Sequence, residues 1–484
     1  MKIAYKNVLT LVVLAFAIAF QPGCTKDFEE INTNPNAPVE VQPQLLLRQV
    51  IYDMGEQMSY EGFVAGNLLG QYFSMVDFNL FDRHNLRQPQ LGGNPWPVLY
   101  RNLRDNQTLI QLADVEPNTV YRGPSLVLKA YISMMITDIY GDVPYSEAAR
   151  AKEGIIAPKY DNQQEIYLGP DGILATLERA VAEMKAYQGA ATLQGDILYN
   201  GNLTNWIALA NSLRIKALMR ISDRQNVGAQ LQTIVNTGEF IKTASQNARF
   251  SFTDGAPNNF RMATLRSGDF NLYVLSTTFD TIAEIYGDTR LNTFFRPTSG
   301  DPSVYRGLDN GINSAQTSIS LANYSLTGTL FREQTSRMSA NFMTGWETLF
   351  LLAEAAQKGL VSGSAKTYYD DAVQQAFAYW QTAMPANYLS QGNAAFGNID
   401  PLEQIITQKW IASITNGYEG WIEWRRTGFP RFIKPAAGSL NNGVVPVRMP
   451  YPTDEEALNA TNFNQASANT NGNSVNSRVW WDNN

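Results

Sequence analysis

Residues 344–380, TGWETLFLLAEAAQKGLVSGSAKTYYDDAVQQAFAYW, predict how this chain folds. Thr344 followed three residues later by Glu347 is the pattern of a helix N-cap, and Gly359 is typical of the position just past a helix end. The second half of the stretch again places large and small apolar residues at helical spacing. Two helices joined by so short a connection lie antiparallel, so the stretch predicts a helix hairpin.

The same spacing recurs along much of the chain, and a glycine or proline follows some of the segments. Further helices are predicted at 96–112, 121–140, 202–224, 402–414 and 420–426. Because the helices fall into pairs with short turns, we predict a mainly α fold. The expected architecture is a scaffold of tetratricopeptide-like helix hairpins, although a strict 34-residue period is missing.

Two regions rich in Gly, Asn, Ser and Thr lack helical spacing, at 77–97 and at about 250–340. We predict long irregular loop insertions there, and insertions on a scaffold usually carry function. The Asn-rich tail, 459–484, is also predicted to be irregular up to Val479. We expect Trp480 and Trp481, which follow, to pack back onto the body.

The first residues have the pattern of an export signal. Lys2 and Lys6 precede an apolar run at 8–20, which is too short to span a bilayer but fits a signal peptide. Cys24, the only cysteine, follows this run, as in lipoproteins whose cysteine is acylated and anchors the chain. We therefore predict a signal peptide at 1–23, a lipidated flexible tether at 24–43 and a single domain at 44–484.

Composition excludes several functions. The net charge of −7 becomes about −9 without the two lysines of the signal peptide, and no basic run offers a nucleic-acid site. His84 is the only histidine, and we expect it in a surface loop, so zinc sites with several His ligands are excluded. No Gly-x-Ser-x-Gly motif accompanies it, and no metal or cofactor is predicted. Paired carboxylates, as in glycosidases, remain an alternative.

Several motifs together resemble the SusD/RagB-like nutrient-binding outer-membrane lipoproteins. They are Cys24–Phe28 with Asn32–Asn36, Lys129–Tyr131 with Tyr140–Tyr145, Asn211–Ala217, Leu349–Ala355, Gln408–Ala412, Asn416–Gly428 and Arg448–Pro452. The resemblance covers nearly the whole chain. Each motif is weak alone, but their order behind a lipoprotein signal is specific.

The resemblance implies a non-enzymatic, lipid-anchored protein at the cell surface of the outer membrane. Such a protein captures an oligosaccharide or peptide and delivers it to a SusC-like TonB-dependent transporter, over which it closes as a hinged lid. The acidic residues Asp27, Glu29 and Glu30 resemble the family's signal for surface export. Two alternatives stay open: a surface glycosidase, and a structural cap of the transporter without ligand affinity of its own.

Aromatic side chains outside the helical stripes are the candidate ligand contacts, because sugar rings stack on aromatic rings and their hydroxyls bond to amides and carboxylates. The candidates are Phe78, Phe81, Tyr273, Tyr305 and Tyr324, with the polar companions Asp77, Asn79, Asp82, Asn271 and Asn323. A peptide would instead need edge-strand hydrogen bonds or pockets.

The remaining motif residues are expected to serve the scaffold. Trp410, Trp421 and Trp424 have the spacing of core residues. Arg425 and Arg426 should form ion pairs with Glu419 and Glu423, and the alternative role of the two arginines is contact with the transporter.

Overall fold

The computed structural model describes residues 41–87, 91–315 and 318–484, of which 43–484 form one compact unit. Cys24, the predicted signal peptide, the acidic residues after Cys24 and most of the predicted tether lie outside the described residues. Within the described ranges, no helix is both long and apolar enough to cross a bilayer.

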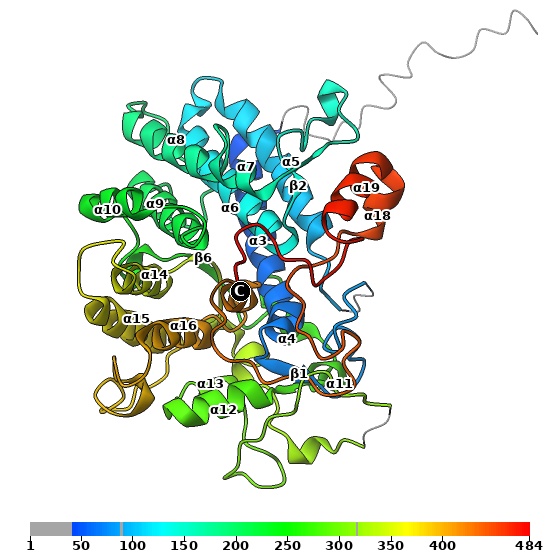
Figure 1. The fold of residues 1–484 in the computed structure, drawn as a ribbon. Coiled ribbons are helices and arrows are strands. Elements are labelled where there is room, and N and C mark those ends of the chain that lie inside the picture. Colours follow the sequence, from blue (N-terminus) through cyan, green and yellow to red (C-terminus); the bar gives the residue numbers. More distant parts are fainter. Residues whose placement is uncertain (1–40, 88–90, 316–317) are drawn as a thin grey trace, which may run out of the picture. The chain divides into compact units, whose positions relative to one another are not determined.

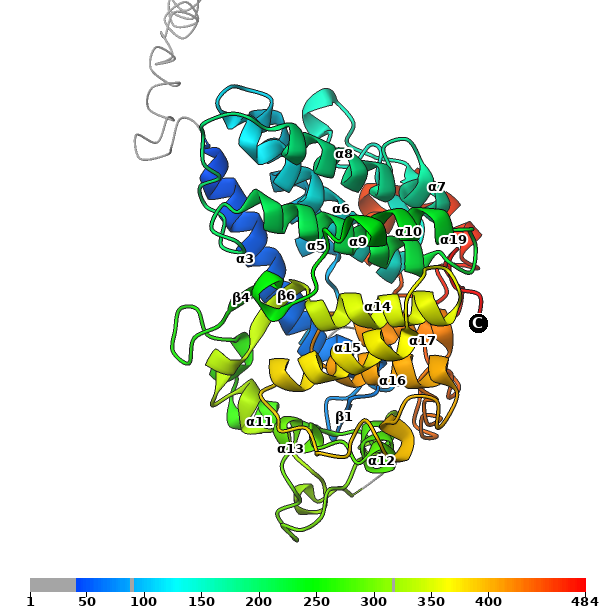
Figure 2. The same cartoon turned by 90° about the vertical axis from the view of Figure 1, so that its left-hand side faces the viewer.

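Helices packed in pairs form the scaffold of this unit (Figures 1 and 2). The main ones are α3 (Pro43–Glu61), α5 (Trp96–Ala113), α6 (Arg122–Tyr140), α7 (Gln163–Leu168), α8 (Ile173–Ala186), α9 (Leu203–Arg220), α10 (Gly228–Thr237), α14 (Gly345–Gln357), α15 (Ala365–Tyr379), α16 (Pro401–Ala412) and α17 (Glu419–Thr427). Helix α6 packs against α5 and α8, α8 against α9, and α14 against both α15 and α16. This architecture confirms the predicted mainly α fold.

The predicted N-cap at Thr344 is present in α14, where its side chain accepts a hydrogen bond from the Glu347 N–H at 3.4 Å. In a complete capping box the glutamate side chain would bond back to the cap residue. The Glu347 carboxylate instead pairs with Lys216 Nζ of α9 at 2.8 Å. The cap residue therefore also positions a charge that joins two helix pairs.

The predicted insertion begins and ends at a small sheet. Strand β4 (Ala248–Ser251) pairs antiparallel with β6 (Ser339–Met343), so the inserted chain leaves and re-enters the scaffold at one place. Between them the chain is less irregular than predicted, since α12 (Thr277–Tyr286) is a regular helix with Ser276 as its N-cap. Short helices α11 (Ser267–Phe270) and α13 (Leu291–Phe294) flank it. Phe279, Ile282 and Ala283 of α12 are buried at helical spacing, in a helix too short to stand out in a Gly- and Asn-rich region.

The C-terminal tail also departs from the prediction, because helices α18 (Thr453–Leu458) and α19 (Ala460–Asn469) replace the expected irregular chain. After them the tail returns to the scaffold as predicted. Trp481 is buried and donates from Nε1 to Asp138 Oδ1 at 2.9 Å, and Trp480 packs against the main core.

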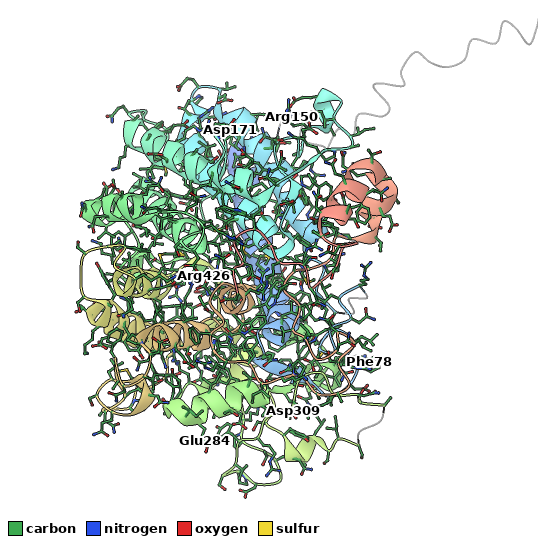
Figure 3. The ribbon with its side chains drawn as sticks, viewed as in Figure 1. Phe78, Arg150, Asp171, Glu284, Asp309 and Arg426 are labelled. Atoms are coloured by element: carbon green, nitrogen blue, oxygen red, sulfur yellow. The ribbon has the colours of Figure 1, made fainter. Side chains whose placement is uncertain are left out.

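Buried charges join the helix pairs at the centre of the scaffold, where Figure 3 labels Arg426. We call this set the charge cluster: Asp138, Lys216, Arg220, Glu347, Glu354, Lys409, Glu419, Glu423 and Arg426, all buried. The Glu419 carboxylate contacts three of the cations: it lies 2.9 Å from both Lys216 Nζ and an Arg220 nitrogen, and 3.2 Å from Lys409 Nζ. Burial by itself raises the pKa of Glu419, but these three cations hold it at about 2.

The predicted scaffold ion pair of Arg426 with Glu423 is confirmed at 2.8 Å, and Arg426 also bonds to Glu354 at 2.6 Å. The prediction for Arg425 was wrong: its guanidinium donates to the Val447 carbonyl at 2.8 Å and stacks on Trp421, 3.8 Å from the ring centroid. Both arginines are buried, so neither is exposed to a partner.

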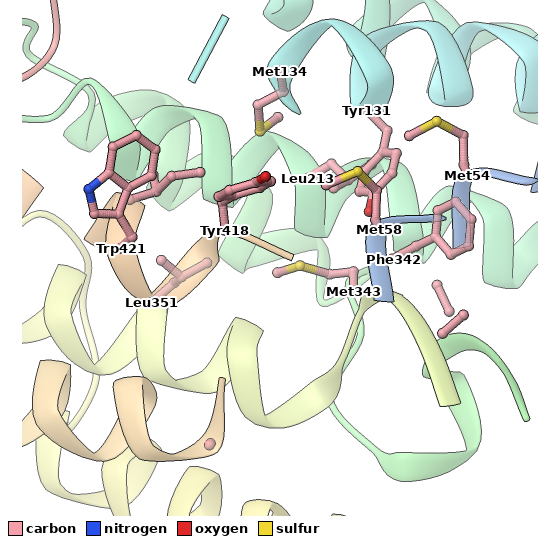
Figure 4. Packing of buried hydrophobic residues seen from close by; sticks show 14 of the residues in the cluster. Met54, Met58, Tyr131, Met134, Leu213, Phe342, Met343, Leu351, Tyr418 and Trp421 are labelled. Atoms are coloured by element: carbon pink, nitrogen blue, oxygen red, sulfur yellow. The ribbon is translucent and has the colours of Figure 1, made fainter. Parts of the chain in front are cut away.

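The hydrophobic core fills the space between the helix pairs and includes the predicted Trp410 and Trp421, which are fully buried. Trp424 is partly buried and stacks on Phe432 with a centroid separation of 4.7 Å. Figure 4 shows Met58, Tyr131 and Phe342 from α3, α6 and β6 meeting in this core.

Candidate functional site

Strand β5 holds together segments that are far apart in the sequence. β1 (Phe73–Met75) pairs antiparallel with β5 (Tyr273–Leu275). Leu326 forms an isolated bridge with Val274, and the N–H of Leu308 donates to the carbonyl of the last β5 residue at 2.8 Å. The loops that follow β1 and α13 are therefore fixed on one small sheet.

A second hydrophobic cluster, smaller than the main core, lies under these loops. Its members are Val76, Val274, Leu308 and Ile312, with Tyr324 and Leu326 among the residues packed against them. We call residues 76–84, 301–315 and 318–326 the loop region. The cluster supplies it with an apolar base of its own.

The buried carboxylate of Asp82 ties the two halves of the loop region together. It accepts hydrogen bonds from Asn310 Nδ2 at 2.6 Å, from Ser74 Oγ at 3.1 Å, and from the N–H groups of Met75 and Gly311 at 3.3 and 3.2 Å. No lysine, arginine or histidine of the described residues lies within ion-pair distance of this carboxylate. Burial therefore raises the pKa of Asp82 to about 6, although the hydrogen bonds act in the opposite direction.

Four of the predicted ligand contacts are buried. They are Asn79, Phe81, Asp82 and Tyr273. We therefore correct their role from binding a ligand to stabilising the packing of the loops. Asn79 donates from Nδ2 to the Ile312 carbonyl at 2.9 Å, and Tyr273 stands edge-on to Phe63 at 5.2 Å between centroids. Aromatic residues in a polar sequence were expected to face solvent, but here β5 and the loop packing turn them inward.

His84 is buried as well, against the prediction of a surface position. The segment after α17 covers it, since the Leu440 N–H donates to the Arg83 carbonyl at 2.6 Å and Ser439 Oγ lies 3.3 Å from His84 Nδ1. Burial lowers the pKa of His84 to about 4. The imidazole is therefore neutral at physiological pH.

Phe78 is the most exposed large aromatic residue of the loop region, with 64% of its surface accessible. Its φ is +48°, in the left-handed range that bulky residues rarely adopt. The Asp77 carboxylate stabilises this turn by accepting bonds from the Phe78 N–H at 2.8 Å and from Ser314 Oγ at 3.2 Å. A strained backbone that presents an apolar ring to solvent is typical of a binding site.

The other predicted contacts are less exposed than Phe78 or purely polar. Tyr305, Tyr324 and Asn271 are half-buried, and Asp77 and Asn323 are exposed. Tyr324 lies on the second hydrophobic cluster, which places it in the same region as Phe78. Val76, which directly precedes Asp77 and Phe78, belongs to the same cluster. Among the described residues, no hydrogen bond joins Asn271 to Asp77, Phe78 or Tyr324.

Sequence reasoning missed two residues of this region. Asn310 bonds to Asp82 and to the Phe73 carbonyl, and exposed Asp309 accepts from Thr277 Oγ1 at 2.7 Å. Figure 3 labels Asp309 at the same end of the molecule as Phe78. The turn dipeptide Asn310-Gly311, close to Tyr305, was the available signal.

The described residues contain no group of three or more acidic, His or Cys side chains that could hold a metal ion.

Solved structures similar to this chain share its fold over nearly their whole length. A chitin-binding protein is 25% identical, with a TM-score of 0.78 over 92% of this chain and 100% of that one. A SusD homolog from Bacteroides fragilis is also 25% identical, with a TM-score of 0.78 over 91% of this chain and 99% of that one. An outer membrane protein of Bacteroides vulgatus, described as involved in nutrient binding, is 24% identical, with a TM-score of 0.77 over 92% and 100%.

No curated protein matches the sequence. The model of the SusD-like family described as "Starch-binding associating with outer membrane" matches residues 35–452. That range includes the helix pairs, the charge cluster and the loop region. The chain therefore belongs to the SusD-like family of outer-membrane-associated nutrient-binding proteins, which bind their ligands without catalysis.

Proposed function

We propose that this protein captures an oligosaccharide at its loop region and delivers it to a SusC-like TonB-dependent transporter, while anchored to the outer face of the outer membrane through Cys24. The observation that carries the proposal is Phe78, an exposed ring held in a left-handed turn. Such a ring offers one apolar face to the C–H groups of a sugar.

Exposed polar groups of the loop region suit the hydroxyls of the same ligand. Asp77, Asp309 and Asn323 are exposed and offer carboxylate and amide groups. The second hydrophobic cluster and the Asp82 bonds keep this surface preorganised, so little ordering cost accompanies binding. The family description and the chitin-binding relative both favour a glycan over a peptide.

A binding screen of residues 25–484 tests the ligand class, with malto-oligosaccharides, chitin oligosaccharides and a peptide mixture as probes. We expect an oligosaccharide to bind and to be recovered intact. In Phe78→Ala we expect affinity to fall by about tenfold, or 1.4 kcal/mol. Ile156→Ala, which removes another exposed apolar side chain, should leave the affinity unchanged.

Other outcomes would select the alternatives. Cleavage of the oligosaccharide would indicate a glycosidase, and binding of peptides alone would change the ligand class. A structural cap would be indicated by two results together. No oligosaccharide or peptide would bind, and the lipidated protein would co-purify with a β-barrel from outer membranes. Failure of the barrel to co-purify would contradict the delivery step.

A further inference from the structure

A polar cavity of about 230 Å³ lies between α5, α6 and the chain that follows α6. Lys129 of α6, Gln107 of α5 and Tyr145 are among its lining residues, together with Arg150 and Asp171. Figure 3 labels Arg150 and Asp171 at the end of the molecule opposite Phe78 and Asp309. The cavity is therefore separate from the loop region.

Lys129 is the cation without an ion pair in this cavity. Its ammonium group lies 5.4 Å from the centroid of the Tyr145 ring, and within the described ranges no carboxylate comes within ion-pair distance of it. Burial lowers the pKa of Lys129, and the more distant Asp171 opposes this effect. A partly desolvated ammonium group gains from an anionic ligand more than an exposed one does.

The formal charges of the four charged residues that line the cavity sum to zero, but Lys129 is the one among them that has no ion pair within the described part of the chain. Arg150 pairs with Glu153, and Arg179 pairs with Asp171 at 3.0 Å. The carboxylates of Glu153 and Asp171 are thus already paired with arginines, and neither is paired with Lys129. A carboxylate ligand would supply the ion-pair partner that Lys129 lacks among the described residues.

A second polar group in the cavity is also free to bond. The Gln107 side chain has no hydrogen-bond partner among the residues that the structure describes. Its amide offers both donors and an acceptor. Ala149, another lining residue, has φ of +61°, an uncommon left-handed conformation for alanine. Local backbone strain of this kind clusters at binding sites.

We propose that this cavity binds a small hydroxylated carboxylic acid, such as a single hexuronate unit. Lys129 takes the carboxylate, Gln107 bonds to a hydroxyl, and Leu103 and Ala148 contact the apolar side of the ligand. The cavity volume of about 230 Å³ has room for one such unit. The site is independent of the loop region, so its failure leaves the proposed function untouched.

Calorimetric titration of residues 25–484 with glucuronate, glucose and acetate tests the proposal. We expect glucuronate to bind with a Kd on the order of 1 mM, and glucose and acetate to bind at least tenfold more weakly. Lys129→Met should weaken glucuronate by about tenfold to a hundredfold, as loss of a charged hydrogen bond does. Gln107→Leu should weaken it severalfold.

Lys152→Met is the matched control. Lys152 is an exposed lysine that lies between Arg150 and Glu153 in the sequence but does not line the cavity. The substitution should leave glucuronate affinity unchanged. If Lys129→Met folds poorly, Lys129→Arg serves as a second variant. It keeps the charge and should retain most of the glucuronate affinity. Equal affinity in Lys129→Met and the wild type would overturn the proposal. So would equal binding of glucose, equal binding of acetate, or no binding of glucuronate.

Discussion

The charge cluster and the loop region both bury carboxylates, but they stabilise them in opposite ways. Glu419 in the cluster has three cations within 3.2 Å. Asp82 in the loop region has four neutral hydrogen-bond donors and, among the described residues, no cation within ion-pair distance. Accordingly the pKa of Glu419 is lowered to about 2, whereas that of Asp82 is raised to about 6.

This difference matches what each region has to do. Ion pairs among five helices (α6, α9, α14, α16 and α17) fix how the helix pairs meet, because removing one partner leaves another charge buried and unpaired. The donors that bond to Asp82 are neutral, so breaking these bonds leaves no second buried charge unpaired and should cost less than breaking the charge cluster. The scaffold is thus expected to be rigid, and the loop region to open at a lower free energy.

The largest expected effect is at Arg220, which pairs with Asp138, Glu419 and Glu423. Arg220→Met should lower the free energy of unfolding by about 3–5 kcal/mol, because three buried carboxylates lose a shared cation. Urea unfolding measures it. Arg179→Met breaks only an exposed ion pair with Asp171 and should cost about 0–1 kcal/mol. Equal losses of unfolding free energy in the two variants would show that the buried charge cluster stabilises the fold no more than an exposed ion pair does.

The next effect is a pH dependence of opposite sign in the two regions. Asp82 binds its proton more tightly in the folded state, so its contribution is full below 3.8 and is lost as the pH rises through about 6. The contribution of Glu419 is present above 4.5 and is lost as the pH falls toward 2. At about 1.4 kcal/mol per pKa unit, the rise at Asp82 corresponds to about 3 kcal/mol.

Unfolding free energies between pH 4 and 7 test this sign. The wild type should lose stability relative to Asp82→Asn as the pH rises across that window, since asparagine does not titrate. Parallel curves for the two proteins would mean that Asp82 is not stabilised in its protonated form.

A smaller effect should follow from Asp82→Ala, which leaves the donors of Asn310 and Ser74 without their acceptor. We expect a loss of about 2 kcal/mol, confined to the loop region. Hydrogen exchange should accelerate in residues 73–84 and 308–312 and stay unchanged in α14 and α16. Asp77→Ala, an exposed carboxylate of the same loop, is the control. Faster exchange throughout the scaffold would mean that the two regions unfold together.

The same contrast explains what the sequence could predict. Helix pairs, the Thr344 cap and the Arg426–Glu423 pair follow from local spacing, which is visible within one or two turns of the chain. The loop region depends on contacts between residues more than 200 positions apart, such as Asn310 with Asp82. Composition suggested that the aromatic residues outside the helices are exposed, yet Tyr273 lies in β5, whose three residues are all buried, whereas Phe78 is exposed. The cations that surround Glu419 come from α9 and α16, again beyond local patterns.

The smallest expected effect on stability is at Phe78, where a substitution should change ligand binding but hardly change the free energy of unfolding. Phe78→Gly removes a left-handed phenylalanine, whose conformation costs roughly 1–2 kcal/mol, but adds chain entropy to the unfolded state. The free energy of unfolding should therefore stay constant or rise by at most about 1 kcal/mol, while oligosaccharide affinity falls. Thermal unfolding and the binding screen measure the two quantities on one sample. A stability loss larger than 1 kcal/mol would instead show that the ring packs on the protein. Phe78 would then belong with the support residues, and the exposed ring would no longer indicate a ligand.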